Sequence, residues 1–393
     1  MVAAKSYGVP FYCAAWVPSD KIQPKESAVD EEEEEEEKSP PPPSEEDVGG
    51  GRWRTEKLVV LGGGGGEGSS GVPNALFLAR FDPASDSLSE QPVHRLGTGD
   101  DVPYRLTVHP GGDGLICSFP KGCRWFEWDV PRDVESCNLG LQSSDKTLTQ
   151  LENVGLQLAL AFNTDGSMLA SGGEDGYLRI FKWPSMETIL DQSEAHDSVK
   201  NLHFSVDTKF LVSLGSSGPC KVWDLASATV VANLSKETGE IFSNCRFSQS
   251  TNNTLYLTTF RGERGNVMFW SSTSWKRVGL RQIAREPISA FSVSSDGRLL
   301  AVGTIEGDIL IINSSNMRVR EAVKKAHRGV VTALEFSQDS SALVSSSFDY
   351  TARVMLIKDK KGTNNTWVLI LLILLVILAY FLRTKGFPSS PLS

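Results

Sequence analysis

The stretch "LALAFNTDGSMLASGGEDGYLRIFKW", residues 158–183, decides the fold of this chain. It opens with an alternation of apolar residues, passes through a polar turn and an apolar run, and ends with a Gly/Asp turn and a further alternating run. Alternation with a period of two is typical of a β-strand with one buried face. The stretch therefore predicts several short strands joined by tight turns.

The same pattern recurs along the chain. It is clear in residues 199–225, 288–313 and 331–357 and looser in residues 243–270. The last apolar residue of the first strand returns every 42 to 46 residues, at Phe162, Phe204, Phe247, Val293 and Phe336. Blades of WD-repeat propellers have a period of about 40–45 residues. Each repeat is therefore interpreted as one four-stranded blade.

Two upstream segments fit the same template. One has Val108 at the position of the recurring phenylalanine, and the other is assembled from residues 11–20, 57–63 and 74–82 with an interruption. Seven blades close a propeller, so we predict an all-β, seven-bladed WD-repeat-like β-propeller over residues 1–358. The last blade lacks an outer strand, and we expect residues near the N-terminus to supply it, because a closed ring has no open sheet edge.

Only some of the polar residues typical of such repeats are present, and no repeat has the full set. They are His196, His327, Asp175, Asp349 and the pair Trp223 and Asp224. We interpret them as packing and turn residues. The five histidines lie in no GxSxG or HExxH pattern, so a hydrolase or other enzyme is disfavoured. The cysteines form no CxxC pair, which disfavours a zinc site.

The net charge of -9 is concentrated in an acidic segment. Residues 26–47 include a run of glutamates followed by a run of prolines, a composition that cannot bury enough apolar surface to order itself. We expect residues 18–57 to be a disordered insertion in the first blade, either without a role or in contact with a basic partner. No clustered Lys/Arg surface is evident, so we expect no nucleic-acid partner.

The C-terminal stretch "TWVLILLILLVILAYFL", residues 366–382, is uncharged. At about 1.5 Å per residue it is long enough to cross a bilayer as a helix. The N-terminus lacks a signal-peptide pattern. We therefore expect a single transmembrane helix over 366–382, a cytosolic propeller and a short lumenal tail over 383–393. A short span suits the thin endoplasmic reticulum membrane.

The sequence "GGGGGEGSSGVPN", residues 62–74, stands between two strand-like runs. Gly66, Gly68 and Gly71 match GxGxxG, but a strand rather than a helix follows Pro73, and no GK[ST] pattern is present. We therefore expect no nucleotide to be bound by this chain. A plain hairpin does not explain the length of the connection, because hairpin loops usually have two to five residues.

The run "LVVLGGGGGEGSSGVPNALFL", after an N-terminal "YGVPFYCAAW" and before a propeller, resembles the Sec-twelve family. "HPGGDGLICSFPKGCRWFEWD" is similar to the plant branch of that family. Its members are membrane-anchored guanine-nucleotide exchange factors that act on the Sar-type small GTPase, which starts COPII coat assembly at the endoplasmic reticulum. In that family the glycine-rich loop is organised by a potassium ion and engages the GTPase.

The resemblance implies a site made of this loop. Its residues would be Gly63, Gly64, Gly65, Gly66, Glu67, Gly68, Ser69, Ser70, Gly71, Val72, Pro73 and Asn74. Asn74 would give a side-chain oxygen to the potassium ion, and carbonyls of the glycine segment would give the rest. Ser69 and Ser70 depart from the two asparagines expected in fungal members.

The resemblance thus implies an exchange factor that promotes GDP release and GTP loading, without covalent catalysis, at the endoplasmic reticulum membrane. Such a factor works by binding the nucleotide-free GTPase better than the loaded one. The alternative is an anchored adaptor that helps cargo leave the endoplasmic reticulum without exchange activity. The intact Gly/Pro/Asn pattern favours the exchange factor.

Overall fold

A computed structural model describes residues 4–23, 52–66, 68, 70–131, 138–250, 254–358, 371, 373–377 and 379–380. The chain divides into two compact units, Met1–Leu356 and Ile357–Ser393. The first unit contains all the β-strands of the described part of the chain.

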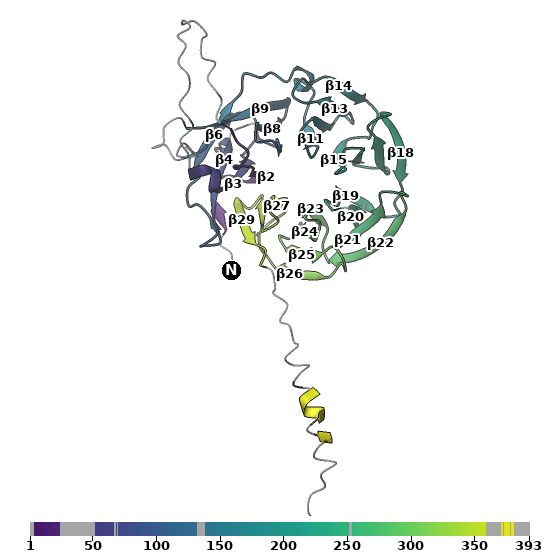
Figure 1. Ribbon diagram of the computed structural model, residues 1–393. Helices are drawn as coiled ribbons and strands as arrows, with labels where there is room; N and C mark the ends of the chain where they lie inside the picture. Colours follow the sequence, from purple (N-terminus) through teal and green to yellow (C-terminus); the bar gives the residue numbers. More distant parts are fainter. Residues whose placement is uncertain are drawn as a thin grey trace, which may run out of the picture. The chain divides into compact units, whose positions relative to one another are not determined.

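The described strands form seven antiparallel sheets arranged around a ring (Figure 1), which confirms the predicted all-β, seven-bladed propeller. The first blade contains β2 (Phe11–Val17), β3 (Lys57–Gly63), β4 (Asn74–Asp82), β5 (Ser87–Leu88) and β6 (His94–Gly99). The second contains β7 (Arg105–Val108), β8 (Gly114–Phe119), β9 (Gly122–Asp129) and β10 (Gly140–Ser143). The third contains β11 (Gln157–Phe162), β12 (Met168–Gly173), β13 (Leu178–Lys182) and β14 (Thr188–Gln192).

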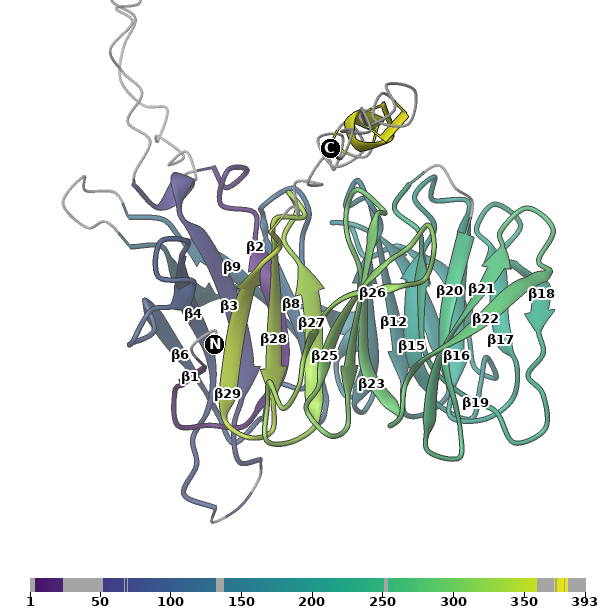
Figure 2. The same cartoon turned by 90° about the horizontal axis from the view of Figure 1, so that it is seen from below.

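The remaining blades repeat this order from the centre of the ring outward (Figure 1), and the strands run between the two faces of the ring (Figure 2). The fourth contains β15 (Val199–Phe204), β16 (Phe210–Gly215), β17 (Cys220–Asp224) and β18 (Thr229–Leu234). The fifth contains β19 (Ile241–Phe247), β20 (Thr254–Arg261), β21 (Arg264–Ser271) and β22 (Arg277–Ala284). The sixth contains β23 (Ile288–Val293), β24 (Leu299–Thr304), β25 (Ile309–Asn313) and β26 (Val319–Val323). The seventh contains β27 (Val331–Phe336), β28 (Ala342–Ser347), β29 (Thr351–Leu356) and β1 (Lys5–Ser6).

The apolar residues that set the repeat have a common place in the fold. Each is the last residue of the innermost strand of its blade: Val108, Phe162, Phe204, Phe247, Val293 and Phe336. The middle strands of most blades are almost wholly buried, because neighbouring blades cover both of their faces. The period of the sequence is therefore the period of the blades.

The ring is closed by the N-terminus, as predicted. Strand β1 pairs with β29 in antiparallel register, with Lys5 opposite Ala352 and Ser6 opposite Thr351. The pairing covers the outer edge of the last blade. Exposed edges invite pairing with other chains, so this closure protects the sheet.

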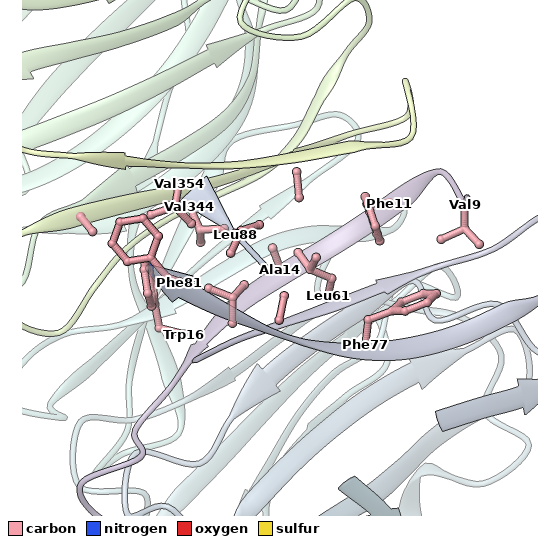
Figure 3. Packing of buried hydrophobic residues seen from close by; sticks show 14 of the residues in the cluster. Val9, Phe11, Ala14, Trp16, Leu61, Phe77, Phe81, Leu88, Val344 and Val354 are labelled. Atoms are coloured by element: carbon pink, nitrogen blue, oxygen red, sulfur yellow. The ribbon is translucent and has the colours of Figure 1, made fainter. Parts of the chain in front are cut away.

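The apolar core is divided among the interfaces between blades. One cluster joins the first blade to the seventh and includes Phe11, Leu61, Phe77, Val344 and Val354 (Figure 3). Other clusters join the first blade to the second, the second to the third and the third to the fourth. Burial of apolar side chains stabilises a fold by about 25 cal/mol per Å² removed from water. Each blade is thus held mainly by its neighbours.

The repeat-specific polar residues have structural roles. The ring of His196 bonds Ser213 Oγ at 2.8 Å, and Trp223 Nε1 donates to the same oxygen at 2.8 Å. His327 contacts Ser345 Oγ at 2.9 Å and Thr351 Oγ1 at 2.7 Å. These bonds tie turns to strands within a blade.

The acidic insertion lies mostly outside the described residues, which omit 24–51. Its two ends belong to the packed propeller. Ile22 and Trp53 are both 2% exposed, and Trp53 lies in the 3-10 helix η1 (Arg52–Thr55). A second 3-10 helix, η2 (Thr149–Leu151), precedes the third blade. The boundaries of 18 and 57 predicted for a disordered insertion therefore include ordered residues.

The C-terminal unit is described at only a few positions. Leu371, residues 373–377 and residues 379–380 are helical. No helix among the described residues is both long enough and apolar enough to cross a membrane. The transmembrane helix predicted over 366–382 is therefore not supported by the structure. The other residues of that segment and the predicted tail over 383–393 lie outside the described residues.

Candidate functional site

The glycine-rich segment connects β3 to β4. The two strands pair with each other from Lys57 opposite Phe81 to Gly63 opposite Ala75. Gly62, Gly63 and Asn74 therefore belong to the strands, and residues 64–73 form the connection, which we call the glycine loop. The face of the propeller that carries this connection is called the loop face.

The first residue of the glycine loop is fixed by two close approaches. Gly64 N donates a hydrogen bond to the Pro10 carbonyl at 3.1 Å. A Cβ atom at Gly64 would lie 2.1 Å from Asn74 Oδ1. No side chain fits in that space, and the φ angle of +154° also favours glycine. Glycine is required here because two other parts of the chain lie against the backbone.

Asn74 is the internal support of the glycine loop. Its side chain is only 5% exposed, and its Oδ1 accepts a hydrogen bond from Gly66 N at 3.0 Å. Its Nδ2 donates to the carbonyls of Gly66 at 3.3 Å and Gly99 at 3.0 Å. One buried amide therefore ties the loop to the end of β6. Gly66 has a φ of +81°, which side-chain-bearing residues rarely adopt.

The outer part of the glycine loop is anchored on one side and exposed at its tip. Gly65 N donates to the Val72 carbonyl at 3.3 Å, and Val72 N donates to Ser70 Oγ at 3.3 Å. The Val72 side chain packs against the core cluster between the first and seventh blades. Other described residues of the tip are exposed, namely Gly68, Ser70, Gly71 and Pro73. Glu67 and Ser69 lie outside the described residues.

Aromatic rings lie beneath the base of the glycine loop. Tyr7 stacks on Phe77 with ring centroids 6.0 Å apart. Phe11 meets Phe77 edge to face, also at 6.0 Å, and Figure 3 shows these two rings. The Tyr7 hydroxyl donates to the Ser89 carbonyl at 2.8 Å. Burial raises the pKa of Tyr7 to about 12, so the hydroxyl stays protonated. These rings give the loop a rigid floor.

The oxygens around Asn74 are neutral amide oxygens. They are the Asn74 side-chain oxygen and the main-chain carbonyls of Gly66 and Gly99, and the Asn74 nitrogen bonds both carbonyls. Potassium ions are held in proteins by sets of carbonyl oxygens that replace water of hydration. By donor type, the residues at this position fit a monovalent cation. Among the described residues, no three His, Cys, Asp or Glu side chains gather into a metal-binding group.

The structure also shows supporting residues that were not predicted. Pro10 bonds Gly64 and Gly99 bonds the Asn74 amide, both from segments that are distant in sequence, and Tyr7 packs on Phe77 in the neighbouring core. The segment "YGVPFYC", which contains Tyr7 and Pro10, stood out in the sequence, but nothing in it indicated this contact. Gly99 could not be identified from the sequence, because it contributes only its main-chain carbonyl.

The arrangement is suited to binding rather than to bond chemistry. The glycine loop presents backbone groups and small side chains at an exposed tip, above a base that is fixed by hydrogen bonds and packing. Such a tip can dock into a complementary surface with little loss of conformational entropy, because its shape is set in advance.

The chain is similar to known proteins over most of its length. Residues 153–182 and 319–354 match the family model described as "WD domain, G-beta repeat". The chain is 50% identical over 359 residues to SEC12-like protein 2 of Arabidopsis thaliana, with 91% of this chain and 88% of that protein covered. It is 34% identical to SEC12-like protein 1 of the same plant, over 72% of this chain and 71% of that protein.

More distant proteins extend the comparison. The chain is 27% identical to the guanine nucleotide-exchange factor SEC12 of Mus musculus, over 65% of this chain and 67% of that protein. A chain in a solved structure titled "COPII on membranes, outer coat vertex" has a TM-score of 0.67 at 17% identity, covering 92% of this chain and 87% of its own length. That likeness shows the fold alone. The identity to the two plant proteins, over most of both chains, places this chain in the SEC12-like family.

Proposed function

We propose that this protein is a guanine-nucleotide exchange factor for a Sar-type small GTPase, and that it promotes GDP release and GTP loading at the start of COPII vesicle formation. The observation that carries the proposal is the glycine loop, held in one shape by the Asn74 amide, in a chain of the SEC12-like family. The naming of the mouse relative as an exchange factor supports the same activity.

The proposed mechanism needs no nucleophile or general base. An exchange factor accelerates release by binding the nucleotide-free GTPase more tightly than the loaded one, and its effect is limited by that difference in affinity. The exposed tip around Gly68 and Gly71 would press on the nucleotide-binding region of the GTPase. The buried hydrogen bonds of Asn74 would keep the loop in one conformation, so that contact changes the conformation of the GTPase rather than that of the loop.

A potassium ion is part of the proposal. Asn74, Gly66 and Gly99 would hold it through their neutral oxygens, and its positive charge would help to fix the base of the loop. The residues of this chain would still provide the contact surface for the GTPase.

The proposal also includes attachment to the endoplasmic reticulum membrane through residues 366–382. The described helical positions in this segment are apolar and exposed, as at Leu371, Leu374 and Val376. Alkaline extraction of membranes from cells that express the full chain tests this attachment. The chain should stay in the membrane pellet, and a version with Leu374→Lys, Leu375→Lys and Val376→Lys should be released. Full release of the unsubstituted chain would contradict the anchor.

The exchange activity is tested by nucleotide release from a Sar-type GTPase loaded with fluorescent GDP. The full chain in detergent is compared with its Asn74→Ala version, in potassium buffer and then in sodium buffer. We expect acceleration by the full chain, a fall of about tenfold or more with Asn74→Ala, and a lower rate in sodium. Gly97→Ala is the matched control, because an added Cβ there meets no atom within 4 Å.

Two results would contradict parts of this proposal. Release at the spontaneous rate, with a folded chain and a competent GTPase, would exclude exchange and favour the anchored adaptor. Equal acceleration in potassium and sodium would remove the ion from the mechanism and leave the exchange activity standing.

A further inference from the structure

A group of exposed and half-buried aromatic side chains lies on the loop face, where β2 and β7 begin and where β28 turns into β29. It consists of four aromatic side chains, which we call the mouth patch: Tyr12, Tyr104, Phe348 and Tyr350. Phe348 is 44% exposed and Tyr350 is 41% exposed, which is high for rings of this size. Tyr12 meets Phe348 edge to face at 4.9 Å and lies 6.1 Å from Tyr104. Grouped exposed aromatics are typical of protein-binding surfaces.

The turn that carries Tyr350 differs from its counterparts in other blades. The turns between the second and third strands of the third to sixth blades each contain a glycine at positive φ: Gly176 at +82°, Gly218 at +77°, Gly262 at +60° and Gly307 at +84°. The seventh blade has Tyr350 in this role, at a φ of +70°. A bulky residue is disfavoured in this conformation. The backbone at Tyr350 is therefore more strained than it would be with glycine at this position.

The strained turn is locked by the carboxylate of Asp349. This side chain accepts hydrogen bonds from Thr351 N at 3.0 Å and from Arg328 N at 2.6 Å, and Asp349 N donates to Ser347 Oγ at 3.1 Å. Burial alone would raise the pKa of Asp349, but hydrogen bonds from His327 and Thr351 lower it below its ordinary value. The turn is thus fixed, and Phe348 and Tyr350 are held outward in advance of any contact.

The mouth patch is continuous with the base of the glycine loop. Pro10, whose carbonyl accepts the Gly64 N–H, is two residues before Tyr12. Pro103 precedes Tyr104, and its Cβ lies 3.0 Å from the position of a Cβ at Gly62. The Phe11 carbonyl accepts from Thr332 Oγ1 at 2.8 Å, which joins the first blade to the seventh beneath the patch.

We infer that the mouth patch is a second docking surface for the same small GTPase that the glycine loop engages, and that Phe348 and Tyr350 are its anchoring side chains. This inference rests on the proposed function. The two features lie on one face, and Pro10 and Pro103, which are close in sequence to Tyr12 and Tyr104, contact the chain at the base of the glycine loop. A partner seated on the glycine loop would therefore also cover the patch. Aromatic anchors that are rigid before binding lose little conformational entropy and often carry much of an interface's affinity.

The inference is tested by the affinity of the full chain for the nucleotide-free GTPase, with three variants. Tyr350→Gly removes the ring and relieves the positive φ, so its melting temperature should equal or exceed that of the unsubstituted chain. Phe348→Ser removes the neighbouring ring. Val206→Ser is the matched control, because Val206 is 41% exposed in the β15–β16 connection, at the opposite ends of the inner strands.

The expected result is an affinity about tenfold lower for Tyr350→Gly and Phe348→Ser, with Val206→Ser unchanged. Affinities within about twofold of the unsubstituted chain for both patch variants would overturn the inference and leave the exchange activity untouched. If the patch variants lose GTPase binding but the unsubstituted chain does not accelerate nucleotide release, the docking surface is supported and the exchange activity is overturned. Absence of any GTPase binding by the unsubstituted chain would overturn both.

Discussion

The side-chain amide of Asn74 and the main chain of Gly66 bond each other in both directions. Gly66 N donates to Asn74 Oδ1 at 3.0 Å, and Asn74 Nδ2 donates to the Gly66 carbonyl at 3.3 Å. Asn74 is the first residue of β4, so its position is set by the sheet. The Asn74 side chain therefore links the middle of the glycine loop to the rigid blade, in addition to the bond from Gly64 N to Pro10.

Substitution of this amide should loosen the glycine loop. Asn74→Ala removes three hydrogen bonds from a buried position and leaves main-chain groups without partners, which costs about 1–3 kcal/mol of unfolding free energy. Urea unfolding measures the loss, and hydrogen exchange at Gly66 N–H should become faster. Asn316→Ala, in an exposed turn, is the control and should change stability by less than about 1 kcal/mol. Equal stability and equal exchange in both variants would show that the amide does not support the loop.

A side chain at Gly64 should displace the glycine loop without touching its tip. In Gly64→Ala the new Cβ would lie 2.1 Å from Asn74 Oδ1, so either the amide or the backbone must move. We expect lower stability and lower nucleotide release than in Gly97→Ala, whose Cβ meets open space. Thermal unfolding and the release assay measure the two effects. A Gly64→Ala chain as stable and active as Gly97→Ala would contradict the close approach.

The carboxyl of Glu335 should give stability a distinct dependence on pH. Burial raises its pKa to about 8 from the ordinary 4.5, although the Arg246 charge opposes the rise. Between these values the folded state binds more protons than the unfolded state, so this group's contribution is full below pH 4.5 and is lost as the pH rises through 8. Relative to Glu335→Gln, the unsubstituted chain should lose stability from pH 5 to pH 8.5.

Two histidines give stability the opposite dependence on pH, and their effect cancels in the comparison with Glu335→Gln. Burial lowers the pKa of His203 to about 3 and that of His196 to about 4, so their contribution is lost as the pH falls below 6.5. Both groups are present in each chain of the Glu335→Gln comparison, so their effects cancel in the difference of unfolding free energies. A difference that stays constant from pH 5 to pH 8.5 would show that Glu335 titrates normally.

Removal of the closing strand should weaken the whole ring. Deletion of residues 1–6 eliminates β1 and leaves the outer edge of β29 unpaired, with a loss of about 2 kcal/mol or more from its hydrogen bonds and packing. Lys5→Ala is the control, because it removes the ion pair with Glu90 and keeps the backbone pairing. Urea unfolding should separate the two. Equal stability of both versions would mean that β1 does not help to close the propeller.

The sequence alone determined the blades. The recurrence of Phe162, Phe204, Phe247, Val293 and Phe336 predicted five blades. The two upstream segments that fit the same template predicted the other two and the need for an N-terminal closing strand. This was possible because strands and turns depend on local alternation and turn residues, which repeat along the chain. Residues 62–74 were likewise recognised as unusual from their composition.

Only the tertiary structure decided how the site is held. Closure of the ring brings Phe348 to Tyr12, and the fold of the first blade brings Pro10 to Gly64 and Gly99 to Asn74. These contacts join residues that are distant in sequence or that act through main-chain carbonyls, and neither kind of contact produces a periodic pattern in the sequence. The strained φ of Tyr350 was hidden for the same reason: a tyrosine in a turn has no unusual pattern until the backbone around it is fixed by Asp349.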